Sequence, residues 1–137
     1  MINRYFLRLA SVAAGIFMAC LIAGLFIIFL AGRSARKAIG NFKPVMAELS
    51  DGIYQGNFTY LGGVISAQVS FEVRQGKLGI VKFDKLYGTR SLGAAQRVYA
   101  AIDDQRDLDF DGVSGATVTS NLARAAIKNA IDRGPRE

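Results

Sequence analysis

Four hydroxyl side chains lie close together near the end of the chain, in a segment of small residues that could carry a phosphate group. The segment, residues 111–120, reads DGVSGATVTS, and its hydroxyls are those of Ser114, Thr117, Thr119 and Ser120. Gly115 permits backbone angles that are closed to other residues, so a bulky group could approach the backbone here. A threonine or serine hydroxyl needs a base to become a nucleophile. The sequence contains no His, so we expect another protein to supply that base.

A helix is predicted directly after this segment. Its apolar residues recur at helical spacing and are Leu122, Ala123, Ala126, Ile127, Ala130 and Ile131. Thr119 or Ser120 is the predicted N-cap, and Gly134-Pro135 ends the helix. Thr117 is therefore expected at or just before a helix N-terminus, where free N–H groups favour a phosphate. Taken alone, the Ser-Gly-Ala-Thr string is equally typical of a plain turn before a capped helix.

The segment resembles the flavinylation motif of the FMN-binding domain family. This family includes the flavin-carrying subunits of sodium-pumping quinone reductases and of related ferredoxin:NAD oxidoreductases. The resemblance implies that Thr117 carries FMN through a phosphoester bond, with Ser114, Gly115, Ala116, Thr119 and Ser120 as its neighbours in the cofactor site. It also implies a separate magnesium-dependent FMN transferase, which would recognise Asp111, six residues before the threonine.

Upstream segments resemble the same family. Residues 51–56 (DGIYQG) are similar to its opening strand, residues 60–63 (YLGG) to its aromatic and paired-glycine turn, and residues 75–78 (QGKL) to a later turn. Residues 88–93 (GTRSLG) lack the Glu and Pro found there in larger members, which indicates a compact form. We expect Gly62 and Gly63 to let backbone approach the flavin, and Tyr60 to pack near the ring. The alternative is a hairpin turn without cofactor contact.

An uncharged apolar run from Leu9 to Gly32 predicts a membrane-spanning helix. Its length is roughly 36 Å at the helical rise, enough to cross a bilayer. A cleaved signal peptide is the rival interpretation, but its apolar region would be shorter and Arg33 is unsuited to the cleavage site. Cys20, the only cysteine, is expected to be a small apolar residue of the anchor.

Small residues recur every four positions along the predicted span and form one face: Ser11, Gly15, Ala19 and Ala23. Small side chains let a second helix approach closely within lipid. This face is therefore predicted to dock on an integral membrane redox subunit, with self-association as the weaker form of the idea. Small residues are also simply common in membrane spans.

The positive net charge of +6 comes mostly from the flanks of the apolar run. Arg4, Arg8, Arg33, Arg36 and Lys37 lie there, and twelve basic residues face eleven acidic ones in the rest of the chain. This distribution argues against nucleic-acid binding. The positive-inside rule gives a near tie for orientation. The family resemblance implies a cytoplasmic N-terminus and an extracytoplasmic domain on the cytoplasmic membrane.

The predicted fold class is α+β, with one transmembrane helix before a small domain of twisted antiparallel sheet packed by helices. We expect an N-terminus at 1–8, the span at 9–32, a linker at 33–50 and the domain at 51–134. Predicted elements are a short helix at 45–49, strands at 52–60, 64–74 and 78–84, and a helix at 91–103. The strand at 64–74 alternates apolar and polar residues, a half-buried antiparallel pattern.

An acidic segment, 103–111, joins that helix to the threonine motif. It lacks the ligand spacing and terminal Glu of a calcium loop, so a solvated loop without a metal is expected. The sequence also shows no catalytic triad, metal cluster or P-loop. These patterns favour a membrane-anchored electron carrier with covalent FMN over a stand-alone enzyme. The alternative is a non-catalytic membrane module that senses or scaffolds.

Overall fold

The computed structural model describes residues 4–86, 93–105, 107–108, 110 and 117–136. They form two compact units, Met1–Leu30 and Ala31–Glu137. The first unit consists of most of α1, a helix from Arg4 to Ile39 that is long and apolar enough to cross a membrane. No described side chain of this unit is buried. The last nine residues of α1 belong to the second unit, so the first part of the expected linker is helical.

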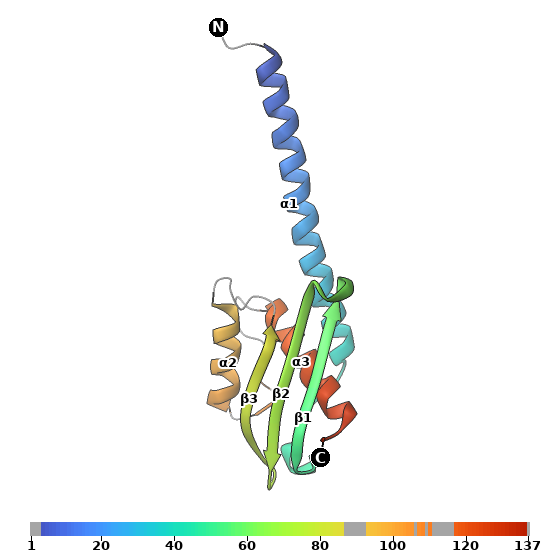
Figure 1. The fold of residues 1–137 in the computed structure, drawn as a ribbon, viewed down its shortest axis with the longest axis vertical. Coiled ribbons are helices and arrows are strands. Elements are labelled where there is room, and N and C mark those ends of the chain that lie inside the picture. The colour runs from blue at the N-terminus through green and yellow to red at the C-terminus, as the bar shows by residue number, and fades with distance from the viewer. Residues whose placement is uncertain (1–3, 87–92, 106, 109, 111–116, 137) are drawn as a thin grey trace. The chain divides into compact units, whose positions relative to one another are not determined.

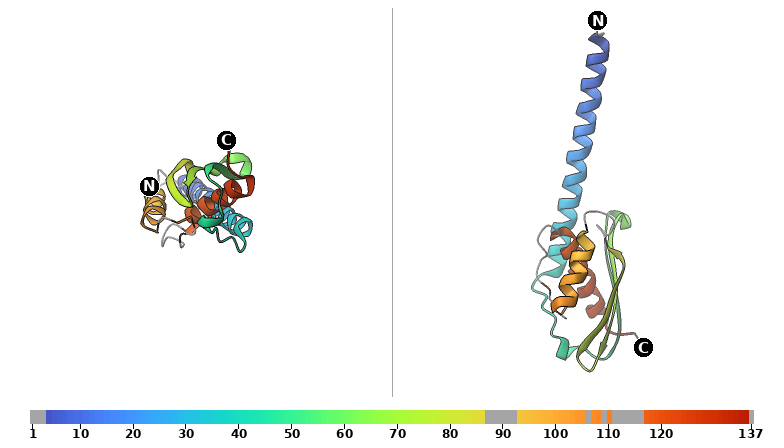
Figure 2. Two further views of the ribbon diagram at one scale, coloured as in Figure 1. Left: turned by 90° about the horizontal axis from the view of Figure 1, so that it is seen from below. Right: turned by 90° about the vertical axis from the view of Figure 1, so that its left-hand side faces the viewer.

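The second unit is an α+β domain, as predicted. Its antiparallel sheet has the order β1 (Gly52–Tyr60), β2 (Ile65–Arg74), β3 (Lys77–Leu86). Two helices, α2 (Ala94–Gln105) and α3 (Thr117–Arg133), lie on one face of the sheet (Figures 1 and 2). Single 3₁₀ turns, η1 (Met46–Glu48) and η2 (Leu61–Gly63), precede and follow β1.

The central strand β2 confirms the predicted alternation. Its inward side chains are at most 3% exposed and are Ile65, Ala67, Val69, Phe71 and Val73. The polar residues between them are half-buried on the opposite face. A period of two places every second side chain on the helix-covered face, and this alternation fixes which face of the strand enters the core.

Helix α3 supplies much of the core, but it begins earlier than the sequence predicted. The predicted N-cap role of Thr119 or Ser120 is wrong, because the helix already starts at Thr117 and both residues lie inside its first turns. The predicted apolar stripe is confirmed, with Leu122, Ala123, Ala126, Ile127 and Ala130 all buried. Gly134, at φ 78°, ends the helix as expected.

Helix α2 lies close to its predicted position. Its inward residues Ala95, Val98 and Ile102 are buried and Tyr99 is half-buried, while Leu92 lies outside the described residues. The sequence predicted a solvated loop for the segment that follows α2, and this prediction is wrong for two of its residues. Leu108 and Phe110 are buried in the core, because apolar side chains between acidic ones gain more from burial than from solvent.

Two residues of the DGIYQG segment, Asp51 and Tyr54, make contacts that stabilise the fold. The carboxylate of Asp51 accepts a hydrogen bond from the N–H of Gln75 (2.8 Å). The Tyr54 ring stacks on Phe71 with centroids 5.1 Å apart, and its hydroxyl donates to the Ser50 carbonyl (2.8 Å). Burial raises the pKa of Tyr54 above its ordinary value of 10.0, so the hydroxyl stays protonated to a higher pH than that of a free tyrosine.

Gly56 lets α3 lie directly against β1. A Cβ at this position would lie 2.3 Å from both the Ala126 carbonyl oxygen and the Ala130 nitrogen. One residue along, the N–H of Asn57 donates to Oδ1 of Asn129 (3.1 Å). At the start of the strand, Gly52 lies beside Pro135. These contacts fix α3 antiparallel to β1, so the first residue of α3 lies toward the end of β1.

Candidate functional site

Thr117 is the first residue of α3, and it is exposed to solvent. The first four N–H groups of a helix have no partner within it, and the dipole makes this end positive. A phosphate on the Thr117 hydroxyl would therefore meet favourable groups at once. This placement confirms the prediction that Thr117 lies at a helix N-terminus. Asp111, Ser114, Gly115 and Ala116 lie outside the described residues, so their roles stay predictions.

The other two hydroxyls of the described part of the motif are buried. Thr119 is 5% exposed and Ser120 is fully buried. A large cofactor could not be attached to either without opening the core. Within residues 117–120, only the Thr117 hydroxyl is therefore accessible to a modifying enzyme.

The glycine turn between β1 and β2 lies at the same end of the sheet as Thr117. Gly56 lies beside Ala126 and Ala130 of α3. From Gly56 to Tyr60 the strand extends about 13 Å, a length that α3 spans with roughly nine residues. Tyr60 is therefore level with the first turn of α3. Gly62 and Gly63 have positive φ (63° and 95°), and among the residues that the structure describes no atom lies within 4 Å of a Cβ at either position. None of the described residues covers the backbone at this turn, and contact of Tyr60, Gly62 or Gly63 with flavin stays a prediction.

The end of α1 also packs beside the candidate site. A Cβ on Gly32 would lie 3.1 Å from Cγ2 of Val118, the residue after Thr117. Ala31, Ala35 and Ile39 are buried in the same unit. Sequence reasoning missed this contact because it assigned these residues to the end of the membrane span and a linker. Their four-residue spacing is the signal that could have revealed it.

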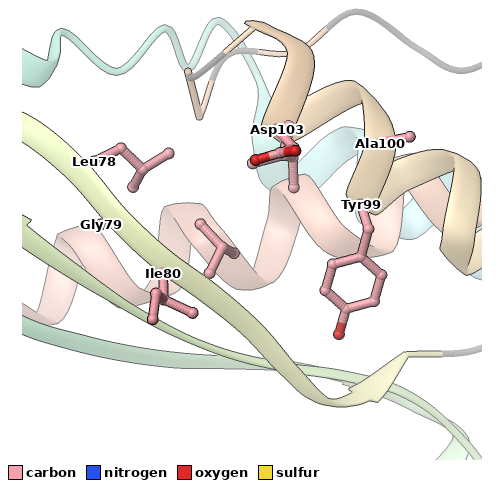
Figure 3. Close-up of a pocket in the computed structure, with 8 residues that line it drawn as sticks. Leu78, Gly79, Ile80, Tyr99, Ala100 and Asp103 are labelled. Carbon is pink, nitrogen blue, oxygen red and sulfur yellow. The ribbon is translucent and has the colours of Figure 1, made fainter.

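A groove of about 500 Å³ lies elsewhere in the domain, between β3 and α2 (Figure 3). Its strand side is formed by Leu78, Gly79, Ile80 and Val81, and its helix side by Tyr99, Ala100, Ile102 and Asp103. Through the strand register, residues 78–81 are level with the start of β1, the end of the sheet opposite the first turn of α3. The groove is therefore separate from the Thr117 site.

Tyr99 of α2 covers part of β3, an edge strand of the sheet. Its hydroxyl accepts from the N–H of Phe83 (2.8 Å) and donates to the carbonyl of the same residue (3.2 Å). The Phe83 ring meets the Tyr99 ring edge-on, with centroids 5.2 Å apart. Tyr99 therefore covers backbone groups of the edge strand that another chain could otherwise pair with.

The fold is an α+β domain in which α3, with the exposed Thr117 at its N-terminus, backs an antiparallel sheet, and the N-terminus of a helix favours a phosphate group. The family model described as the FMN-binding domain matches residues 61–132, just over half of the chain. The chain belongs to the FMN-binding domain family and is a flavin-binding protein. No curated protein and no solved structure matches it.

Proposed function

We propose that this protein is a membrane-anchored electron carrier that holds FMN covalently on Thr117 through a phosphoester bond. It would relay electrons between a redox partner in the membrane and one outside the cytoplasm. The observation that carries the proposal is the contrast at the start of α3. Thr117 is exposed at the helix N-terminus, whereas Thr119 and Ser120 are buried.

The chain supplies position, and the cofactor supplies the redox chemistry. Flavins accept and release electrons singly or in pairs. Helix α3 is held against β1 by the close contact at Gly56 and the hydrogen bond from Asn57 to Asn129, so Thr117 is on a rigid support. Attachment also raises the effective concentration of flavin beside a partner. Since the sequence contains no His, we assign the base that takes the Thr117 hydroxyl proton to a separate FMN transferase.

Attachment is tested by the intact mass of the full-length protein made with and without an FMN transferase. We expect a single addition equal to one FMN less one water, present only with the transferase. The loaded protein should then show a flavin absorption spectrum that bleaches on reduction and returns on oxidation. Unchanged mass in the presence of an active transferase would refute covalent attachment. A flavin that cannot be reduced reversibly would refute the electron-carrier role.

The membrane helix is assigned a docking role. Ser11, Gly15, Ala19 and Ala23 are all exposed along one side of α1, and no atom lies within 4 Å of a Cβ placed at Gly15. Within lipid, close packing of small residues replaces the missing hydrophobic drive between helices. We propose that this face binds an integral redox subunit and so holds the flavin near its donor.

Replacing both Gly15 and Ala19 with leucine should release the protein from its redox complex in mild detergent. The added side chains keep the helix apolar but prevent close approach of a second helix. Membrane insertion and flavin loading should be unchanged, and co-purification with the membrane subunit is the measurement.

The matched control for that variant adds the same bulk to the other side of α1. Ala13→Leu combined with Cys20→Leu changes two exposed positions that each lie at least roughly 100° around the helix from Gly15 and from Ala19. This control should stay in the complex. Equal retention of both double variants would show that the small-residue face makes no contact with the partner.

A further inference from the structure

The turn between β1 and β2 presents apolar side chains to solvent. Leu61 is 51% exposed and Val64 is 79% exposed, with the two glycines between them. Leu61 also has a positive φ of 52°. A solvent-exposed turn in this conformation usually takes Gly, Asn or Asp, which tolerate it better than a bulky residue. An apolar residue is thus present where both solvation and backbone preference favour a polar one.

This turn lies at the end of the domain where the chain enters from α1. Gly32 is buried against Val118, in the first turn of α3, and the β1–β2 turn is level with that same turn of helix. Ala31 is fully buried in the domain, and Leu30, directly before it, is the last residue of the other unit. The buried start of the domain is therefore joined directly to the apolar helix through the Leu30–Ala31 peptide bond.

The domain also carries basic side chains shortly after its buried start at Ala31. Arg33, Arg36 and Lys37 lie on the part of α1 that belongs to the domain, and all three are exposed. Positive charge and exposed apolar side chains in one domain are the combination that favours the interface of an anionic membrane.

We propose that Leu61 and Val64 insert into the interfacial layer of the lipid bilayer, so that this end of the domain rests on the membrane surface. The inference depends on membrane anchoring by α1 but not on flavin attachment. Its consequence is that Thr117, at the same end of the domain, is held close to the lipid, on the side from which a membrane redox subunit would be reached.

A single tryptophan tests this insertion, because the natural sequence contains none. Val64→Trp is placed in full-length protein reconstituted into phosphatidylcholine and phosphatidylglycerol vesicles, with and without bromine on the acyl chains. Bromine quenches tryptophan emission only at short range. We expect strong quenching of Val64→Trp by the brominated lipids, together with a blue-shifted emission maximum.

Ile80→Trp is the matched control. Ile80 is 74% exposed, close to the value for Val64, but it lies in the groove region at the opposite end of the sheet. Its emission should be several-fold less quenched in the same vesicles. Equal quenching at both positions, or no quenching at Val64→Trp, would overturn the proposal. Absence of quenching at Val64→Trp would favour a protein partner as the group that covers this turn.

Failure of the anchor itself is separately visible. Vesicle flotation reports whether the chain is bound to the lipid through α1, and quenching is read only from floated protein. If protein floats but Val64→Trp is not quenched, the turn does not insert although anchoring holds. Protein that does not float would overturn membrane anchoring and with it this inference. Flavin attachment to Thr117 is measured separately, so neither a failure to float nor an absence of quenching would bear on it.

Discussion

Replacing Thr117 with alanine is expected to abolish covalent flavin attachment. The substitution removes the one exposed hydroxyl within residues 117–120 and leaves the rest of α3 intact. Alanine is a good helix former, so the domain should fold as before. The protein is made together with its transferase, denatured and run on a gel, and flavin fluorescence of the band is measured. We expect fluorescence from the natural sequence and none from the variant.

Three further variants show whether the hydroxyl of Thr117 is itself the attachment point. Thr117→Ser keeps a hydroxyl and should retain part or all of the fluorescence. Thr119→Ala and Ser120→Ala should stay fluorescent per molecule of folded protein, because those side chains are buried and are not attachment points. Loss of their hydroxyls could still lower stability by about 1 kcal/mol each. A fluorescent Thr117→Ala band would move the site to another residue.

The sheet could be predicted from sequence because its signals are local. The alternation from Ile65 to Val73 is the period of a strand with one buried face, and the structure buries every one of those apolar residues. The apolar stripe of α3 is likewise visible from Leu122 to Ala130. In both cases one repeating pattern is enough to identify the element and its buried face.

The boundaries around the site could not be predicted in the same way. Thr117, Thr119 and Ser120 are all acceptable residues at a helix start. What separates them is tertiary packing, which buries Ser120 in the core and leaves Thr117 outside. No local pattern records that difference. The charges at Arg33, Arg36 and Lys37 indicated the end of a span, although Ala31 and Ala35 next to them are buried in the domain.

The role of Gly56 also became visible only in the structure. In the sequence it is one residue of a segment that resembles the family's opening strand. In the fold it is the point where the backbone of α3 touches β1, a contact between residues about seventy positions apart. A glycine chosen for such close approach looks the same in a sequence as one chosen for a turn.

Gly56→Ala is therefore expected to destabilise the domain severely. The new Cβ would lie 2.3 Å from two backbone atoms of α3, at Ala126 and Ala130, and neither can move without displacing the helix. Overpacking commonly costs 1–3 kcal/mol, so we expect about 3 kcal/mol or more here, where no side chain can rotate away. That is a large share of the roughly 5–15 kcal/mol that stabilises a typical domain. Urea unfolding of the full-length protein in detergent, followed by tyrosine circular dichroism, should show a midpoint lower by about 2 M.

Gly62→Ala is the matched control for stability, because it makes the same chemical change at a glycine whose Cβ would meet no described atom within 4 Å. Its cost should be limited to the left-handed backbone at φ 63°, roughly 1 kcal/mol. Gly56→Ala also displaces the helix that carries Thr117, so flavin loading should fall with folding. If Gly56→Ala unfolds at the same urea concentration as Gly62→Ala, α3 does not depend on this glycine for its position, and the rigid support assigned to Thr117 is lost with it.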